Sequence, residues 1–252
     1  MKTLLTPLFL CLCLAGAAGA SDASEPSILL TLAQKECAAH PDQESCKNGY
    51  AVIKDRAGAF QYLLIPTDPV TGIESPALLD PRAGKYWSGA WRARSRLDAL
   101  AGPILPPDMH GRIPREDVAL AVNSPFARSQ DQLHIHIDCV DGDVQKALRA
   151  VADTFEPGKW LSLSGGLKSH WYQATRLSEA ELGQTNLFRL VADLRPDDPG
   201  LMGATTIVVV GAPGDDAANL YVLVDRVDPT NRDAANGEEL MDHGCSVLGI
   251  GQ

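Results

Sequence analysis

The amino-acid sequence predicts an α+β domain. Two pairs of apolar runs, 50–54 with 60–65 and 206–210 with 220–225, are each joined by a turn-forming segment, a pattern typical of β-hairpins. Other segments carry apolar residues at helical spacing, but they do not alternate regularly with the strands. Hairpins mixed with isolated helices indicate an α+β fold.

The elements expected in the first 140 residues follow from local periodicity. Apolar residues at helical spacing predict a helix after Pro26 and another around Trp87, Trp91 and Leu97. The hairpin of 50–65 lies between them. Loops rich in Pro fill 66–84 and 102–114, and further strands are expected at 118–123 and 132–140.

The remaining elements are expected in the C-terminal part of the chain. Val144, Leu148 and Phe155 belong to the most regular helical pattern of the sequence. Ser178 and Glu181 have the spacing of a capping box that begins a helix. Strands are expected at 160–163 and 171–176, the second hairpin at 206–225, and a helix at 236–243.

The composition excludes several classes of protein. The chain has 252 residues and a formal net charge of -10, which argues against binding to duplex nucleic acid, because phosphates must be neutralised by a basic surface. A content of 45% hydrophobic and 21% charged residues is enough to build a folded core. The mean hydropathy of -0.08 excludes a protein with many membrane spans.

The first 20 residues have the features of a secretory signal or an N-terminal membrane anchor. Lys2 precedes an apolar run, 4–20, that ends in Ala18-Gly19-Ala20. The run is at the lower length limit for a bilayer span, so both forms remain open. We expect export, with residues 21–252 as the folded domain.

Export changes the interpretation of the cysteines. Four of them follow the N-terminal segment: Cys37, Cys46, Cys139 and Cys245. In an oxidising compartment they allow three pairings, and Cys37 with Cys46 would close a short loop of turn-forming residues. Cys139 with Cys245 would then link a central strand to the C-terminal segment. Two disulfides are favoured over a zinc site, because the chain has no Cys-x-x-Cys pair.

The strand predicted at 132–140 contains the side chains that could take part in a reaction. Side chains of a strand alternate between its faces, so Gln132, His134, His136 and Asp138 are expected on one face. The apolar residues between them would pack into the core. We expect the polar face to line a groove or to meet solvent.

Three interpretations of the histidines compete. The first is a half-exposed strand without chemical function. The second is a metal site completed by Asp138 or by a further histidine (His110, His170 or His243). The third is a nucleophilic histidine that attacks phosphorus while neutral donors bind the phosphate oxygens. Donors of this kind in the segment are Asn123, Ser124, Ser129 and Gln132.

The segment Gln132-Leu133-His134-Ile135-His136-Ile137 resembles the histidine-triad signature, His-φ-His-φ-His-φ-φ, with glutamine in the first place. The wider sequence is similar to one family, the bacterial CDP-diacylglycerol pyrophosphatases. Matching segments run through most of the chain: the early cysteine pair, 49–52, 61–67, 72–76, 91–94, 121–124, 165–170 and 242–245.

The resemblance implies a histidine-triad-like antiparallel sheet with packed helices, and an enzyme that needs no metal or cofactor. It implies His134 as the nucleophile, His136 as a phosphate ligand or a support for the intermediate, and Ser129 as a residue that assists the leaving group. Residues implied or expected to bind substrate or phosphate are Asn123, Ser124, Gln132, Lys168 and His170. Among the cations Lys168 is preferred to Arg128 and Arg94.

The reaction implied is hydrolysis of CDP-diacylglycerol to CMP and phosphatidate through a cytidylyl-histidine, as a step of phospholipid metabolism. The expected place is the periplasm or the periplasmic face of the inner membrane, where the enzyme meets its lipid-linked nucleotide. Two other functions stay open. One is a histidine-triad hydrolase or transferase acting on other nucleotide conjugates, and the other is a non-catalytic periplasmic module that binds metal or phosphate.

Overall fold

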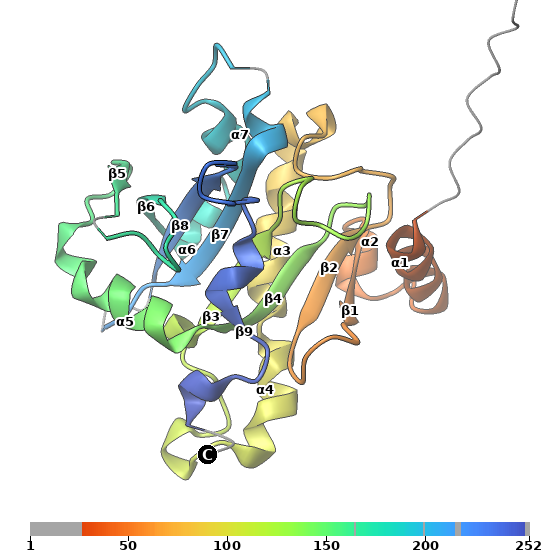
Figure 1. Ribbon diagram of the computed structural model, residues 1–252. Helices are drawn as coiled ribbons and strands as arrows, with labels where there is room; N and C mark the ends of the chain where they lie inside the picture. Colours follow the sequence, from red (N-terminus) through yellow and green to blue (C-terminus); the bar gives the residue numbers. More distant parts are fainter. Residues whose placement is uncertain (1–26, 164, 199, 215–217, 250–252) are drawn as a thin grey trace, which may run out of the picture.

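The computed structural model describes residues 27–163, 165–198, 200–214 and 218–249. Within these residues one antiparallel sheet has the strand order β1-β2-β4-β3-β7-β8-β6-β5, and β9 pairs with β4 beside this path (Figure 1). The strands are β1 (Tyr50–Lys54), β2 (Tyr62–Pro66), β3 (Val118–Val122), β4 (Ile135–Val140), β5 (Leu161–Ser162), β6 (Gln173–Ser178), β7 (Thr205–Gly211), β8 (Asn219–Arg226) and β9 (Met241–Asp242). The predicted α+β class is confirmed.

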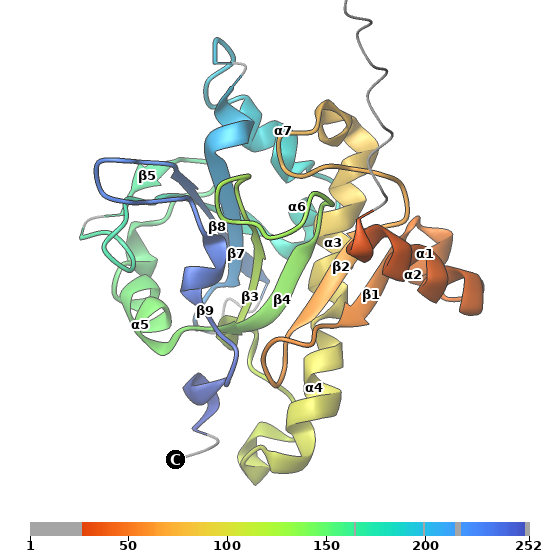
Figure 2. The same ribbon diagram turned by 45° about the vertical axis from the view of Figure 1, so that its right-hand side comes forward.

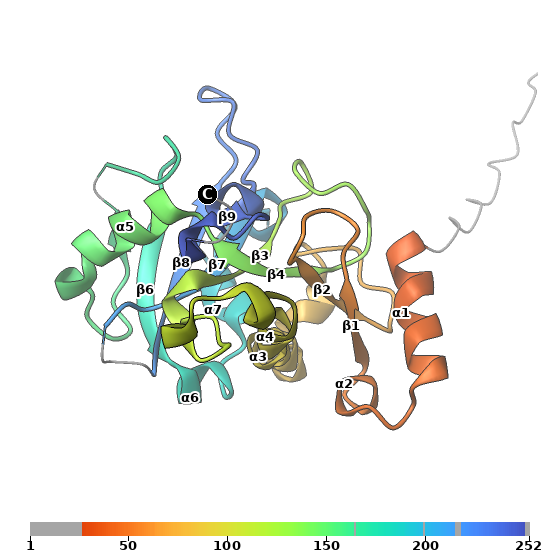
Figure 3. The ribbon, with the colours of Figure 1, turned by 90° about the horizontal axis from the view of Figure 1, so that it is seen from below.

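Helices cover both faces of this sheet. They are α1 (Ile28–Ala39), α2 (Glu44–Lys47), α3 (Gly84–Ala93), α4 (Ser95–Ala101), α5 (Gly142–Ala150), α6 (Glu179–Leu182) and α7 (Leu187–Ala192). The largest core lies between the sheet and α3, α4, α6 and α7, and it contains Trp87, Trp91 and Phe188. On the other face α1 packs on β1 and β2, and α5 packs farther along the sheet. Figures 2 and 3 show α3 and the C-terminal segment on opposite sides of the sheet.

The predicted alternation along β4 is confirmed. Ile135 and Ile137 belong to the core under α3, whereas His136 lies opposite Leu63 and Ala121 on the other face. The polar face was expected to line a groove or meet solvent: His134 does line a small cavity, but His136 and Asp138 are both buried. The segment 237–243, which pairs with the end of β4, covers them.

Two boundaries differ from the expected ones for a physical reason. The strand predicted from residue 132 begins at Ile135, because the side chain of Gln132 bonds to the 66–70 loop and holds the chain there. The helix expected over 236–243 is wrong. This segment forms a short 3₁₀ turn, Gly237–Leu240, and then β9, in which Met241 and Asp242 pair with β4.

Both expected disulfides are present. Cys37 pairs with Cys46, and Cys139 pairs with Cys245 across 106 residues of sequence. The second bond attaches the C-terminal segment to β4, beside the histidines. The capping box of Ser178 and Glu181 is also formed, as predicted.

The predicted signal or anchor, residues 1–20, lies outside the described residues. Among the helices that the structure describes, none combines the length and the apolar character needed to cross a bilayer.

Candidate active site

His134 is held with one ring nitrogen available for attack. Its Nδ1 lies 2.7 Å from the backbone carbonyl oxygen of Gln132. Since a carbonyl only accepts hydrogen bonds, Nδ1 must carry the proton and Nε2 keeps its lone pair in the neutral ring. Burial lowers the pKa of His134, although the bond to Gln132 opposes the shift, so the ring is neutral at pH 7.

His136 lies beside this ring as a hydrogen-bond donor. The two ring centroids are 4.8 Å apart with an edge-to-face arrangement. The amide of Gln61 donates to Nδ1 of His136 at 2.7 Å, which assigns the proton of the neutral ring to Nε2. That Nε2 is buried and has no hydrogen-bond partner among the described residues. Burial, together with His134 and His243, lowers the pKa of His136 well below its usual value, so the ring stays neutral.

Glu238 joins the histidines to the C-terminal segment. One of its carboxylate oxygens accepts a bond from the Gln61 amide at 3.0 Å and lies 3.1 Å from Nδ1 of His136. The other oxygen accepts from Nδ2 of Asn123 at 2.6 Å, and Oδ1 of Asn123 accepts from the Glu238 backbone N–H. Asn123 therefore positions Glu238, and through it Gln61 and His136.

A second histidine–carboxylate pair, His243 with Asp138, lies next to Glu238. Nδ1 of His243 lies 2.7 Å from a carboxylate oxygen of Asp138, and its Nε2 lies 3.9 Å from Glu238. The bond to Asp138 raises the pKa of His243. Burial raises the pKa of Asp138, and the His243 bond opposes that shift. The pair places a histidine with a raised pKa beside the carboxyl groups of Asp138 and Glu238.

A very small cavity, too tight to hold a water molecule, adjoins His134 and is lined in part by Gly72, Asn123, Arg128 and Gln132. The guanidinium of Arg128 is fixed there by a two-pronged pair with Glu74, at 2.6 and 2.8 Å, and by Asp131. Gly72 is required for this position, because a Cβ at residue 72 would overlap Nη1 of Arg128. The cation that lines the cavity is Arg128, although sequence reasoning favoured Lys168.

Two of the expected phosphate ligands have other partners. The Gln132 amide donates to the carbonyls of Pro66 and Asp68 and accepts from the Val70 N–H, so its hydrogen-bonding groups hold the 66–70 loop. Ser124 donates to the carbonyl of Ala234 at 2.5 Å. Of the two, only Gln132 lines the cavity of His134.

Three other expected residues do not line that cavity. Ser129 is exposed and lies on a neighbouring cavity next to the start of α1. Lys168 pairs with Asp141 at 2.8 Å, at the N-terminus of α5. His170 bonds to Glu239 at 2.8 Å, in a separate cluster of carboxylates.

Sequence reasoning missed Gln61 and Glu238, and named His243 only as a possible metal ligand. Gln61 gave a weak signal, as a polar residue that opens an apolar run. Glu238 gave none, because it is 115 residues from Asn123 and lies in a turn. Together these residues surround two neutral imidazoles, one with a free lone pair and one with a free N–H, beside an arginine. Such a set can attack and bind a phosphate group.

Comparisons with known proteins identify the family of the chain. The family model described as CDP-diacylglycerol pyrophosphatase matches residues 26–249. A protein of Yersinia pestis with the name CDP-diacylglycerol pyrophosphatase is 37% identical over 256 residues, covering 98% of this chain and 95% of that protein. A crystal structure of a DUF4931 family protein from Bacillus cereus has a TM-score of 0.41 and 12% identity, over 76% of this chain and 92% of that one. The extent of the first two matches shows that the chain belongs to the CDP-diacylglycerol pyrophosphatase family.

Proposed function

We propose that this chain hydrolyses the pyrophosphate bond of CDP-diacylglycerol, releasing CMP and phosphatidate, and that His134 carries the cytidylyl group between the two half-reactions. The substrate follows from the family. The covalent route rests on one observation, the bond from Nδ1 of His134 to the Gln132 carbonyl, which leaves the Nε2 lone pair free.

In the first half-reaction Nε2 of His134 attacks the phosphorus that bears the cytidine. The N–P bond forms as the bond from that phosphorus to the bridging oxygen breaks, and the electron pair leaves with phosphatidate. The ring becomes positively charged, and the Gln132 carbonyl stabilises the proton on Nδ1. The N–H of His136 donates to a non-bridging oxygen, and the guanidinium of Arg128, held by Glu74 and Asp131, lines the same cavity.

In the second half-reaction water attacks the same phosphorus. The O–P bond forms, the N–P bond breaks, and CMP leaves with the oxygen of water while the proton goes to solvent. His134 is again a neutral ring with its proton on Nδ1. Each step displaces one good leaving group, which avoids direct attack of water on a shielded pyrophosphate.

The rate is expected to fall in acid with an apparent pKa below 6.5, the usual value for histidine. Only the neutral ring attacks, so activity persists above the pKa of His134 and is lost as the pH falls through it. Measuring kcat/KM between about pH 4.5 and pH 8 gives the apparent pKa of this loss of activity. An apparent pKa above 6.5 would point instead to His243, whose pKa is raised, and would contradict attack by a neutral His134.

The intermediate itself tests the proposal. The full chain is mixed with CDP-diacylglycerol in detergent micelles, stopped in alkali, in which an N–P bond survives, and digested for mass spectrometry. We expect a cytidylyl group on the peptide that contains His134, while CMP and phosphatidate accumulate. If the substrate turns over and rapid sampling finds no adduct, covalent catalysis is excluded. If CDP-diacylglycerol is not cleaved but other CDP or ADP conjugates are, the proposed substrate is wrong, while the proposed attack of His134 on phosphorus stands.

The proposal includes export to the periplasm or the periplasmic face of the inner membrane, where the lipid substrate lies at the membrane surface and serves phospholipid metabolism. The signal-like sequence of residues 1–20 supports this location. The two disulfides also support it, because such bonds persist in oxidising compartments.

A further inference from the structure

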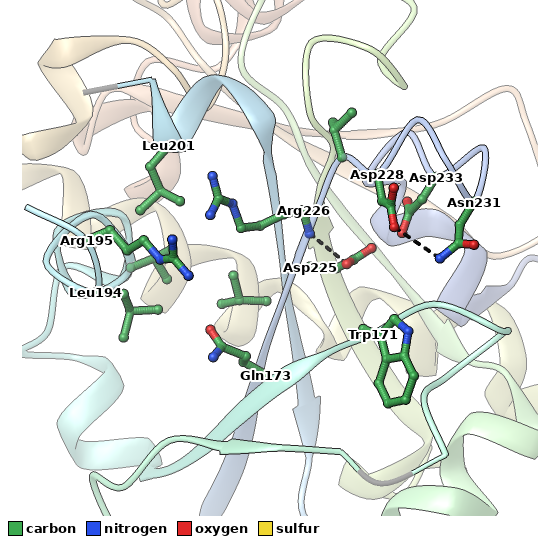
Figure 4. Close-up of a pocket in the computed structure, with 13 residues that line it drawn as sticks. Trp171, Gln173, Leu194, Arg195, Leu201, Asp225, Arg226, Asp228, Asn231 and Asp233 are labelled. Atoms are coloured by element: carbon green, nitrogen blue, oxygen red, sulfur yellow. Dashed lines mark hydrogen bonds between the residues drawn. The ribbon is translucent and has the colours of Figure 1, made fainter. Parts of the chain in front are cut away.

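A second cluster of ionisable side chains lies outside the His134 cavity. It consists of His170, Asp225, Asp233 and Glu239, all buried or half-buried. Asp225 and Asp233 also line a separate cavity of about 470 Å³, shown in Figure 4. The cluster thus has a route to solvent of its own.

The donor atoms of the cluster are close enough to converge on one ion. Nδ1 of His170 lies 2.8 Å from Oε1 of Glu239 and 3.6 Å from Oδ2 of Asp233. One donor atom each from His170, Asp225 and Glu239 lie within 4.8 Å of one another. Donors bound to a cation at about 2.0–2.2 Å are roughly 3 Å apart, so small shifts would close the shell.

Carboxyl groups outnumber basic groups in the cluster among the described residues. Three carboxylates meet one imidazole, and no Lys or Arg of the described chain forms an ion pair with Asp225, Asp233 or Glu239.

Asp225 gives an independent sign that a ligand is missing. Its side chain is 3% exposed, and its Oδ1 accepts the Arg226 backbone N–H at 2.6 Å. Its Oδ2 is buried without a hydrogen-bond partner among the described residues. Figure 4 shows the Asp225 carboxyl group turned toward Asp228 and Asp233.

Further bonds orient the cluster from outside. The hydroxyl of Tyr172 donates to Oε1 of Glu239 at 2.8 Å, and the Ala235 N–H donates to Oδ1 of Asp233 at 2.7 Å. Bonds of this kind hold metal ligands in position in known sites. Here they fix two carboxylates that would otherwise move apart by mutual repulsion.

We propose that His170, Asp225, Asp233 and Glu239 bind one divalent cation of the Mn²⁺ or Zn²⁺ type. One imidazole and several carboxylates are a ligand set that these ions accept. The site is distinct from the histidine pair, although Glu239 follows Glu238 directly in the 3₁₀ turn. An ion there would fix the turn that holds Glu238 beside His136. The residues expected to bind phosphate included His170, which this proposal reassigns.

The test is a titration of the EDTA-treated full chain, carrying no histidine tag, with Mn²⁺ and separately with Zn²⁺. Calorimetry is expected to show one site, and thermal unfolding a rise of roughly 5–10 °C at about 100-fold excess over Kd. Asp225→Asn is expected to abolish this rise without loss of the fold, because its amide can donate to Asp233. Tyr172→Phe is expected to weaken binding by about 10–100-fold.

Controls decide between this cluster and other sites. His134→Ala and Asp143→Asn, a change at an exposed acid, are expected to bind metal like the wild type. If Asp225→Asn does not fold, Glu239→Gln is expected to show the same loss of binding. Absence of a one-to-one complex with either ion overturns the proposal. So does retention of the thermal shift in a folded Asp225→Asn or Glu239→Gln, or its loss in His134→Ala, which would move the ion to the histidine pair.

Discussion

Replacing His134 by alanine is expected to lower the rate of CMP release from CDP-diacylglycerol by about 10⁴-fold or more. The substitution removes the only protein atom that the mechanism bonds to phosphorus. The folded state is expected to survive, because the ring makes one hydrogen bond, to the Gln132 carbonyl, at the wall of a cavity. Steady-state rates in detergent micelles, together with thermal unfolding of each variant, measure the two effects.

Two further variants allow the loss of activity in His134→Ala to be interpreted. His136→Ala removes one donor to the phosphate and is expected to cost less, about 10²–10³-fold in kcat. His110→Asn is the matched control: His110 is exposed, has a positive φ that asparagine tolerates, and is expected to keep full activity. A folded His134→Ala protein with a rate within tenfold of the wild type would remove His134 from the mechanism.

The sequence was sufficient to predict the two faces of β4, for a simple reason. Burial forces a period of two on a strand, so Ile135 and Ile137 identify the core face and place His136 on the other. The periodicity could not show how far the strand extends toward its N-terminus. That boundary depends on Gln132, whose amide pairs with backbone groups of the distant 66–70 loop.

The partners of the histidines were harder to predict. The tautomer of His134 depends on a carbonyl two residues away, but the environment of His136 depends on Gln61 and Glu238, which come from opposite ends of the chain. The ion pairs could not be predicted from the sequence either. Lys168 and Arg128 are equivalent in sequence as cations near polar segments, and only the fold pairs the first with Asp141 and places the second beside His134.

The C-terminal segment makes the site dependent on a covalent link. It covers the histidines with Glu238 and His243, yet β9 pairs with β4 through only Met241 and Asp242. Cys245 follows directly and is bonded to Cys139 of β4. The disulfide therefore keeps the segment 237–243 over the histidines, where the short strand β9 alone would hold it weakly.

Breaking the Cys139–Cys245 bond is accordingly expected to cost about 5 kcal/mol of unfolding free energy, by loop-closure entropy for a separation of 106 residues. The Cys37–Cys46 bond, with a separation of 9, is worth about 3 kcal/mol on the same scale. The long bond can be broken without truncating a buried side chain: the Cys37→Ala/Cys46→Ala variant is unfolded in urea with and without reductant. The difference between its two midpoints, at a known slope, gives the cost of losing the long bond.

Activity is expected to separate the two bonds more sharply than stability does. In conditions where every form is folded, the variant without Cys37 and Cys46 should keep wild-type CMP release, because α1 and α2 carry none of the groups around His134. Adding reductant to that variant should then lower kcat, since the segment with Glu238 and His243 is no longer attached to β4. A fully active reduced protein would show that β9 alone holds the cover, and the disulfide would then act on stability alone.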